Sequence, residues 1–330
     1  MQYFNFKNML AYEIKEIEKT ALLDHDQLLQ AVLRMPYRPL SHGQDKLTTF
    51  SAVNGNNSDQ PQYVYPIEES GGKVIGYALC VNMAKRDLPA KFVANEVARR
   101  VKKLEEQTGQ ELEKADLKRI KEETISELID KAFPKEKEID LFIDIENSLV
   151  FVGATSETAA EQCFALLRKV LNSFPAVPLV YDNDIESVLN GIFLKGTVEI
   201  SNTEVHIAPK FKLSEYDSAN YNVTNNLTEC PLESLQELVR EKSLTTVQLE
   251  LITPEANFIV VKPKAGKNNT PTYKGVDTHL QSLLEERMEE DAENQSSDAE
   301  GLQEEYRRFS AEHLIKTMKK IVDYSDKLFN

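Results

Sequence analysis

The stretch TVQLELITPEANFIVVKP, residues 246–263, places two apolar runs on either side of the short connection PEAN. Runs of this length, rich in β-branched and aromatic residues and bounded by turn residues, predict strands. A connection this short joins antiparallel strands, because a parallel pair needs a crossover of a dozen residues or more. The stretch therefore favours an antiparallel sheet and argues against a doubly wound α/β fold.

Strand-rich and helix-rich stretches are expected to alternate along the rest of the chain, so the predicted class is α+β. Asp24 and Ser156 are expected to cap two helices, because each is a short polar residue directly before an apolar helical pattern. Residues 42–62, rich in Gly, Asn, Ser and Gln, predict a long loop. Strands are expected at residues 4–14, 72–83, 137–155 (as a hairpin), 197–201 and 204–213, and helices at 24–35, 156–174, 188–194, 231–242, 277–306 with a polar break near Ser296, and 309–329.

Residues 88–133 predict two antiparallel helices that form an arm. Pro89 suits the first position of a helix, and Gly109 interrupts the helical pattern. The apolar positions recur every three or four residues, so each helix has one apolar face. These positions are Val93, Val97, Val101 and Leu104 in the first helix and Leu117, Ile120, Thr124, Ile125 and Leu128 in the second.

The length of 330 residues predicts two or three regions. We expect an α+β lobe at 1–180 that carries the helical arm at 85–137, a second α+β lobe at 181–275, and an acidic helical region at 276–330. No run of about 20 apolar residues and no leader pattern is present, which predicts a cytoplasmic protein without a membrane span. The three cysteines, Cys80, Cys163 and Cys230, are far apart and are expected to be buried rather than bonded.

Charge is distributed unevenly along the chain. The formal net charge is -15, yet residues 85–137 carry 14 basic and 12 acidic side chains. The acid is concentrated in residues 138–204 and 276–330. Such a balance argues against a protein coated in nucleic acid, but it allows one positive surface.

Basic residues gather on one side of the first arm helix. At 100° per residue, Lys91, Asn95, Arg99, Lys102 and Lys103 lie opposite the apolar face. Such a row suits DNA phosphates, which attract Lys and Arg without any reading of bases. The alternative is a solvated face with local salt bridges, Arg99 with Glu96 and Lys102 with Glu106.

A second set of lysines lies in an expected loop, KPKAGKNNTPTYKG, and in the strand expected at residues 204–213. Lys262, Lys264, Lys267 and Lys274 occur without an acidic residue in KPKAGKNNTPTYKG, and Lys210 and Lys212 occur in PKFK. Here too phosphate contact competes with simple solubility as the explanation.

Enzyme signatures are largely absent, and the sequence predicts no cofactor. AGKNNT does not complete a P-loop, since the required earlier Gly is Val261 and Asn268 follows Lys267 where Ser or Thr is needed. Asp144 and Glu146 are spaced to share a strand face and to hold a metal as in nucleases, but an exposed strand face explains them better. No metal-ligand spacing is formed by the histidines His25, His42, His206, His279 and His313.

Several blocks resemble the recombination-associated protein RdgC family. They are FKNMLAYEI, the LP at Leu88 and Pro89 that opens a charged helix, KAF at 131–133, and above all AEQCFALLRKVLNSFPAVPL. Weaker similarity continues through NLTECPLESL and FSAEHLIKTM. The resemblance implies a horseshoe-shaped monomer that closes as a ring-shaped homodimer around double-stranded DNA, binds without sequence preference, associates with the nucleoid and restrains a RecA-type recombinase.

The resemblance also assigns residues. Arg86 matches a basic residue of the family pattern, Lys131 matches an Arg, and Phe133 matches a Phe near the tip of the arm. Arg168 and Lys169 match the R-K of the family.

The chain departs from the family pattern in three places. Val223, Thr224 and Asn225 replace basic residues and a Gln, Asn172 replaces a Gly, and the Trp residues are missing. These changes mark a distant member, and at residues 223–225 a phosphate contact is lost or weakened.

Three hypotheses follow from the sequence. The first is a non-enzymatic DNA-binding ring that uses Arg86, Lys91, Arg99, Lys102, Lys103, Lys131, Phe133, Lys210, Lys212, Lys262, Lys264 and Lys267. The second is an acidic interaction module that binds a recombination or replication protein without DNA. The third is a metal-dependent nuclease built on Asp144 and Glu146.

Overall fold

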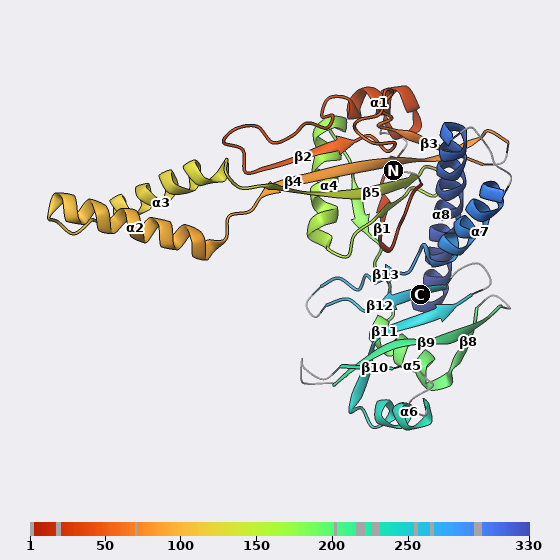
Figure 1. Cartoon of the computed structure of the whole chain (residues 1–330). Coiled ribbons are helices and arrows are strands. Elements are labelled where there is room, and N and C mark those ends of the chain that lie inside the picture. Colours follow the sequence, from red (N-terminus) through yellow and green to blue (C-terminus); the bar gives the residue numbers. More distant parts are fainter. Residues whose placement is uncertain are drawn as a thin grey trace.

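One antiparallel sheet runs through the whole molecule (Figure 1). The computed structural model describes residues 3–17, 21–69, 71–200, 203–215, 222–225, 232–253, 257–264, 267–293 and 299–330. The strand order is β10-β9-β11-β12-β13-β1-β6-β5-β4-β2, with β3 beside β4, β7 beside β1 and β8 beside β9. The strands are β1 Asn8–Ile14, β2 Lys46–Ser51, β3 Tyr65–Glu68, β4 Val74–Arg86, β5 Pro134–Asp144, β6 Leu149–Val152, β7 Ala176–Pro178, β8 Thr197–Ile200, β9 Thr203–Glu215, β10 Asn222–Asn225, β11 Leu244–Ile252, β12 Asn257–Val261 and β13 Thr272–Lys274.

Strand β1 joins the two halves of this sheet. Its start pairs with β13, Asn8 with Lys274 and Met9 with Tyr273, and its remainder pairs with β6. We call β1 to β7 the first half-sheet and β8 to β13 the second half-sheet. The predicted hairpin is confirmed, because β11 and β12 pair antiparallel, although PEAN itself lies largely outside the described residues.

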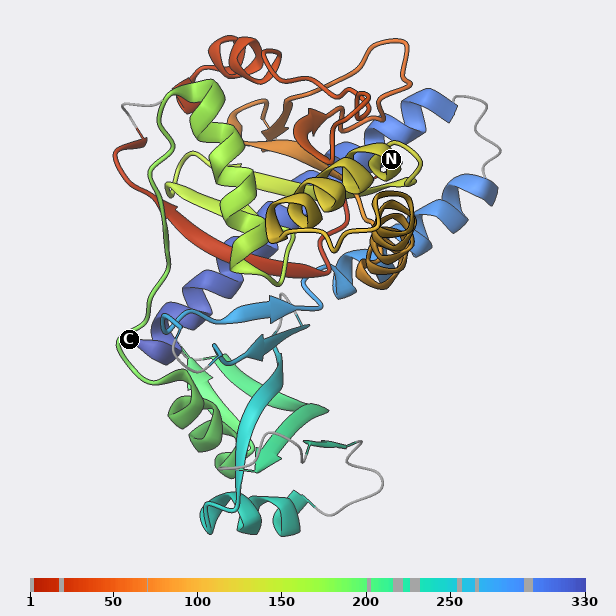
Figure 2. The same cartoon turned by 90° about the vertical axis from the view of Figure 1, so that its left-hand side faces the viewer.

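The helices cover both faces of the first half-sheet. α1 and α4 share a core with one face, and α8 packs against the other (Figures 1 and 2). Side chains alternate between the two cores along β5, with Leu141 and Ile143 on one side and Phe142 on the other, because successive strand residues point to opposite faces. The helices are α1 His25–Val32, α2 Ala90–Thr108, α3 Lys114–Ile129, α4 Glu157–Leu171, α5 Ile185–Lys195, α6 Leu232–Arg240, α7 Thr278–Glu293 and α8 Ala299–Phe329, with a short 3-10 turn at Ala21–Leu23.

Local sequence explains the start of α1 and the end of α4. The Asp24 side chain accepts a hydrogen bond from the Gln27 amide, as predicted for a cap. Ser156 stands at the start of α4 but makes no side-chain cap bond. Asn172, where the family pattern has Gly, ends α4 in the left-handed region at φ 65°, a conformation that Asn tolerates better than most residues.

Two expectations need correction or fall outside the structure. The loop predicted at 42–62 is wrong in part, because Lys46–Ser51 forms β2 against β4. Pairing with the long, buried strand β4 holds Lys46–Ser51 in an extended conformation, although the residues that follow are rich in turn formers. The break predicted near Ser296 and the burial predicted for Cys230 lie outside the described residues, whereas Cys80 and Cys163 are buried free thiols.

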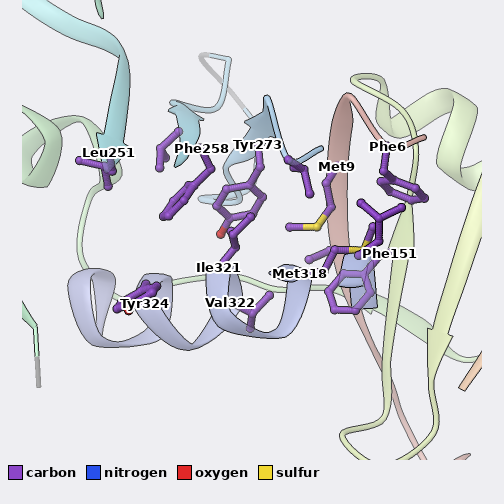
Figure 3. Packing of buried hydrophobic residues seen from close by; sticks show 14 of the residues in the cluster. Phe6, Met9, Phe151, Leu251, Phe258, Tyr273, Met318, Ile321, Val322 and Tyr324 are labelled. Carbon is purple, nitrogen blue, oxygen red and sulfur yellow. The ribbon is translucent and has the colours of Figure 1, made fainter. Parts of the chain in front are cut away.

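Helix α8 completes the core of both half-sheets. Met318, Ile321 and Val322 are buried between Met9 and Phe151 of the first half-sheet and Phe258 and Tyr273 of the second (Figure 3). Tyr273 donates a hydrogen bond to Ser325 Oγ at 2.8 Å. Among the described residues, no helix is both long and apolar enough to cross a bilayer.

Candidate nucleic-acid interface

Helices α2 and α3 form the predicted antiparallel arm, which projects from the ends of β4 and β5 (Figure 1). Gly109 ends α2 in the left-handed region at φ 66°, where a residue without a side chain is least strained. The two helices are joined by Arg100, whose guanidinium bonds both Glu96 on α2 and Glu127 on α3, at 3.2 and 2.6 Å. These bonds raise the pKa of Arg100, chiefly through Glu127.

Contact between the two arm helices is limited. Val93 is the only buried residue of α2, while α3 buries Ile120, Thr124, Leu128 and Ile129. The expected inward position of Leu117 is not observed, because its side chain is 38% exposed. An apolar hollow of about 630 Å³ remains open between the helices near the base, lined by Leu88, Val93, Val97, Ala98, Ile125 and Ile129 among others.

The predicted basic side of α2 is exposed to solvent. Lys91, Arg99, Lys102 and Lys103 are all exposed, and both predicted local salt bridges are present. Arg99 donates to both Glu96 carboxylate oxygens, at 3.0 and 2.6 Å, and Lys102 lies 3.9 Å from Glu106. The hydrogen bonds from Arg99 and then Arg100 hold the pKa of Glu96 below its usual value.

Arg86 lies at the base of the arm, and three groups of the protein hold its guanidinium. Its guanidinium donates to Asp130 Oδ1 at 2.7 Å and to the carbonyls of Ser41 and Gln44 at 3.2 and 3.3 Å. Asp130 also accepts a bond from the Gly43 amide. Only 12% of the Arg86 side chain is exposed, so it anchors the arm to the sheet and the 41–44 loop.

Lys131 and Phe133 lie on the segment that returns from α3 to β5. Both are exposed, Phe133 at 92%. The position expected for Phe133 near the tip of the arm is wrong, because Pro134, the next residue, already pairs with Arg86. Phe133 therefore lies at the base of the arm, and the tip is the turn after Gly109.

The second-half lysines lie near carboxylates. Lys262 pairs with Glu186 of α5, and Lys267 Nζ lies 3.0 Å from Glu157 of α4. Together with Lys264 and Asn269 they line a hollow of about 470 Å³ that also contains Asp182 and Asp184. This hollow is therefore mixed in charge rather than basic.

The PKFK lysines belong to β9. Lys212 is half-buried and its backbone lies between Thr224 and Gln248. Lys210 is in the same strand, but its side chain lies outside the described part. The strand β10 occupies the position where the family pattern is more basic.

Asp144 and Glu146 close the β5–β6 turn. Asp144 is fully buried, and its carboxylate accepts bonds from the Glu146 and Asn147 amides at 3.0 and 3.1 Å. Glu146 pairs with Lys73, and Lys319 of α8 lies 3.4 Å from it. The exposed strand face expected for this pair is wrong for Asp144, whose oxygens stabilise a turn, and the described residues contain no cluster of three metal-ligating groups.

The arm projects to the left of Figure 1 from the first half-sheet, and β12 and β13 lie below it. Seen from that side, the arm points at the viewer and lies above the second half-sheet (Figure 2). The predicted site residues thus form two separate groups, one on the arm and one on the second half-sheet.

Sequence reasoning missed two residues of the arm. Phe92 is 53% exposed, and its position shows on a helical wheel, where it lies on the basic side rather than the apolar side. Asp130 was missed as the partner of Arg86, since a contact between residues 44 positions apart leaves no local pattern.

Comparison with known proteins links the chain to one family. A family model described as "Putative exonuclease, RdgC" matches residues 4–263. The chain is 33% identical over 180 residues to "Recombination-associated protein RdgC" of Pasteurella multocida, covering 54% of this chain and 55% of that protein. The protein of the same name from Proteus mirabilis is 30% identical over 182 residues, 55% of this chain and 57% of that protein. The chain thus spans somewhat over half the length of the curated relatives it matches.

Proposed function

The chain belongs to the RdgC family, and from this premise we propose that it binds double-stranded DNA without sequence preference and acts in homologous recombination. The observation that carries the proposal is the exposed basic side of α2. Lys91 and Lys103 have no ion pair within the described residues, while Arg99 and Lys102 remain 77% and 80% exposed. Cations held at helical spacing neutralise phosphates and leave base edges unread.

We further propose that two copies close as a ring around the duplex. The apolar hollow at the base of the arm and the exposed Phe133 are surfaces that a partner copy would cover. A ring lets an acidic outer surface coexist with a basic inner wall, in a chain of net charge -15. Occupied DNA would be less accessible to a RecA-type recombinase, in the cytoplasm and at the nucleoid.

A salt titration of binding tests the DNA proposal. Purified protein is titrated onto a linear and a covalently closed duplex of the same sequence, and binding is followed by anisotropy or gel shift. We expect affinity to fall with salt with a slope of about -0.9 per phosphate neutralised, and exchange to be slower on closed DNA. No binding to either duplex at low salt would refute the proposal.

A matched pair of triple variants tests the surface. Changing Arg99, Lys102 and Lys103 to Glu is expected to weaken binding and to lower the salt slope. The control changes Arg240, Lys195 and Lys242 to Glu, which alters net charge equally at exposed positions beside the second half-sheet. If both variants bind alike, the α2 surface is not the DNA site.

A second candidate function is binding of a basic protein partner without DNA. The observation that favours it is α7, where Glu285, Glu286, Glu289 and Glu290 are exposed. Pull-down by a basic recombination protein, together with no DNA binding at low salt, would support this function over the first.

Nuclease activity is the third candidate, and the family description raises it. We propose a non-enzymatic role, because the Asp144 oxygens are engaged in the β5–β6 turn. Incubation of linear and plasmid DNA with the protein and magnesium decides the matter: degradation that is lost in Asp144→Asn would establish the enzyme.

A further inference from the structure

Phe92 lies exposed within the basic side of α2. About 20° around the helix axis separates it from Arg99, and about 20° on the other side separates it from Lys103. Lys91 is its neighbour in the chain, and the first turn of α2 contains no acidic residue. A ring that is 53% exposed therefore lies in line with Arg99, about 10 Å along the axis, and Lys103, about 16 Å along it. Glu96, one turn from the ring, is engaged by Arg99 and Arg100.

Packing of the arm does not account for this ring. The contact with α3 is made through the side of α2 that contains Val93, the one buried residue of that helix. The apolar hollow is lined by Val93, Ala94 and Val97, and Phe92 does not line it. Phe92 is therefore available to an external ligand.

The surrounding charges select the class of ligand. Arg99 is fixed in place by two hydrogen bonds to Glu96, and Lys91 and Lys103 have no ion pair within the described residues. A flat apolar ring on a helix side that also presents Lys and Arg matches a stretch of nucleotides, in which a base stacks on the aromatic face while phosphates along the strand contact Lys and Arg. In a duplex the base faces are covered by neighbouring bases, so the matching ligand has unpaired bases.

We propose that Phe92 is a stacking platform for unpaired bases of single-stranded DNA, with Lys91, Arg99 and Lys103 contacting phosphates along the same strand. This inference rests on the proposed DNA-binding function and adds a second substrate form to it. It places contact with single strands on the same arm surface that contacts duplex phosphates.

The absence of tryptophan from the chain allows a direct test. Phe92→Trp introduces a single tryptophan, whose fluorescence is followed while oligothymidylate of about 12 nucleotides is added. Stacking predicts quenching that saturates with binding, whereas heparin, a polyanion without bases, is expected to bind without comparable quenching. Leu238→Trp, at a 39% exposed position of α6, is the control and is expected to stay unquenched.

A second pair of variants measures how much the Phe92 ring contributes to the affinity for single-stranded DNA. Phe92→Leu keeps an apolar side chain without a ring, and we expect about tenfold weaker binding of oligothymidylate with unchanged binding of a duplex. Phe92→Tyr is expected to bind both like the wild type. Circular dichroism confirms that each variant is folded.

The outcomes separate this inference from the proposed function. If Phe92→Leu binds both forms of DNA like the wild type, or heparin quenches Phe92→Trp as strongly as oligothymidylate does, the stacking platform is refuted and duplex binding stands. If Phe92→Leu loses the dimer by sedimentation, Phe92 belongs to a protein interface and the platform is again refuted. If the wild type binds neither DNA form, both proposals fail.

Discussion

Gly76 lies where the structure leaves no space for a side chain. It is in β4, paired with Ile67 of β3 on one side and Asp144 of β5 on the other. A Cβ built on Gly76 would overlap the Ile143 carbonyl oxygen and would lie 2.8 Å from Cδ1 of Ile315 on α8. The oxygen belongs to the backbone of a paired strand, so it cannot rotate away as a side chain end does.

Gly76→Ala is therefore expected to lower the free energy of unfolding by about 3 kcal/mol, at the upper end of the usual cost of overpacking. The methyl group must push β5 or α8 outward, and both contribute to the same core. Urea unfolding followed by circular dichroism measures the effect as a lower midpoint at unchanged slope.

Gly191→Ala is the matched control. Gly191 is in α5, and a Cβ there meets no atom within 4 Å. Alanine is a better helix former than glycine, so this change is expected to stabilise the protein by about 0.5–1 kcal/mol. Equal midpoints for Gly76→Ala and the wild type would refute the packing argument.

Three further predictions concern a buried acid, the arm and α8. Burial raises the pKa of Asp140 from 3.8 to about 7, so the folded state keeps a proton that the unfolded chain releases, and stability should fall as pH rises from about 4 to 7. In Asp140→Asn, the urea midpoint is expected to vary less with pH over this range. A midpoint that varies with pH as much as in the wild type would contradict the prediction. The Gly43 amide and the charges of His42 and Arg86 hold the pKa of Asp130 below its usual value. In Arg86→Ala, the distances between a spin label on the arm and one on the sheet are expected to be distributed more broadly. A distribution as narrow as in the wild type would contradict the anchoring role. Ile321→Ala should cost about 2–5 kcal/mol and raise hydrogen exchange in both half-sheets, whereas a change confined to one half would contradict the shared core.

Local patterns were sufficient to predict the arm and the hairpins. The spacing of Val93 and Ile120 within their helices and the break at Gly109 depend only on nearby residues, and the structure confirms them. The β2 strand was missed because the amino-acid composition of this segment does not indicate that it pairs with β4. Strand pairing is decided by tertiary contacts that override local preference.

The candidate site was less predictable than the fold. Exposure of the α2 cations follows from helical periodicity, and the structure bears it out. The engagement of Arg86 by Asp130 and of Asp144 by its own turn depends on which backbone groups come close after folding. Whether these cations bind DNA remains a prediction for the titrations described above.

The position of α8 in the chain has a consequence for biosynthesis. The described strands all precede Ala299–Phe329 in the sequence, yet both half-sheets pack against this helix. The contact from the Phe4 amide to Ser310 Oγ joins residues 306 positions apart. While the ribosome is still translating α8, both half-sheets present uncovered apolar faces, so the nascent chain completes its core only once α8 has left the ribosome. We expect folding to be slow and the nascent chain to depend on chaperones that shield those faces.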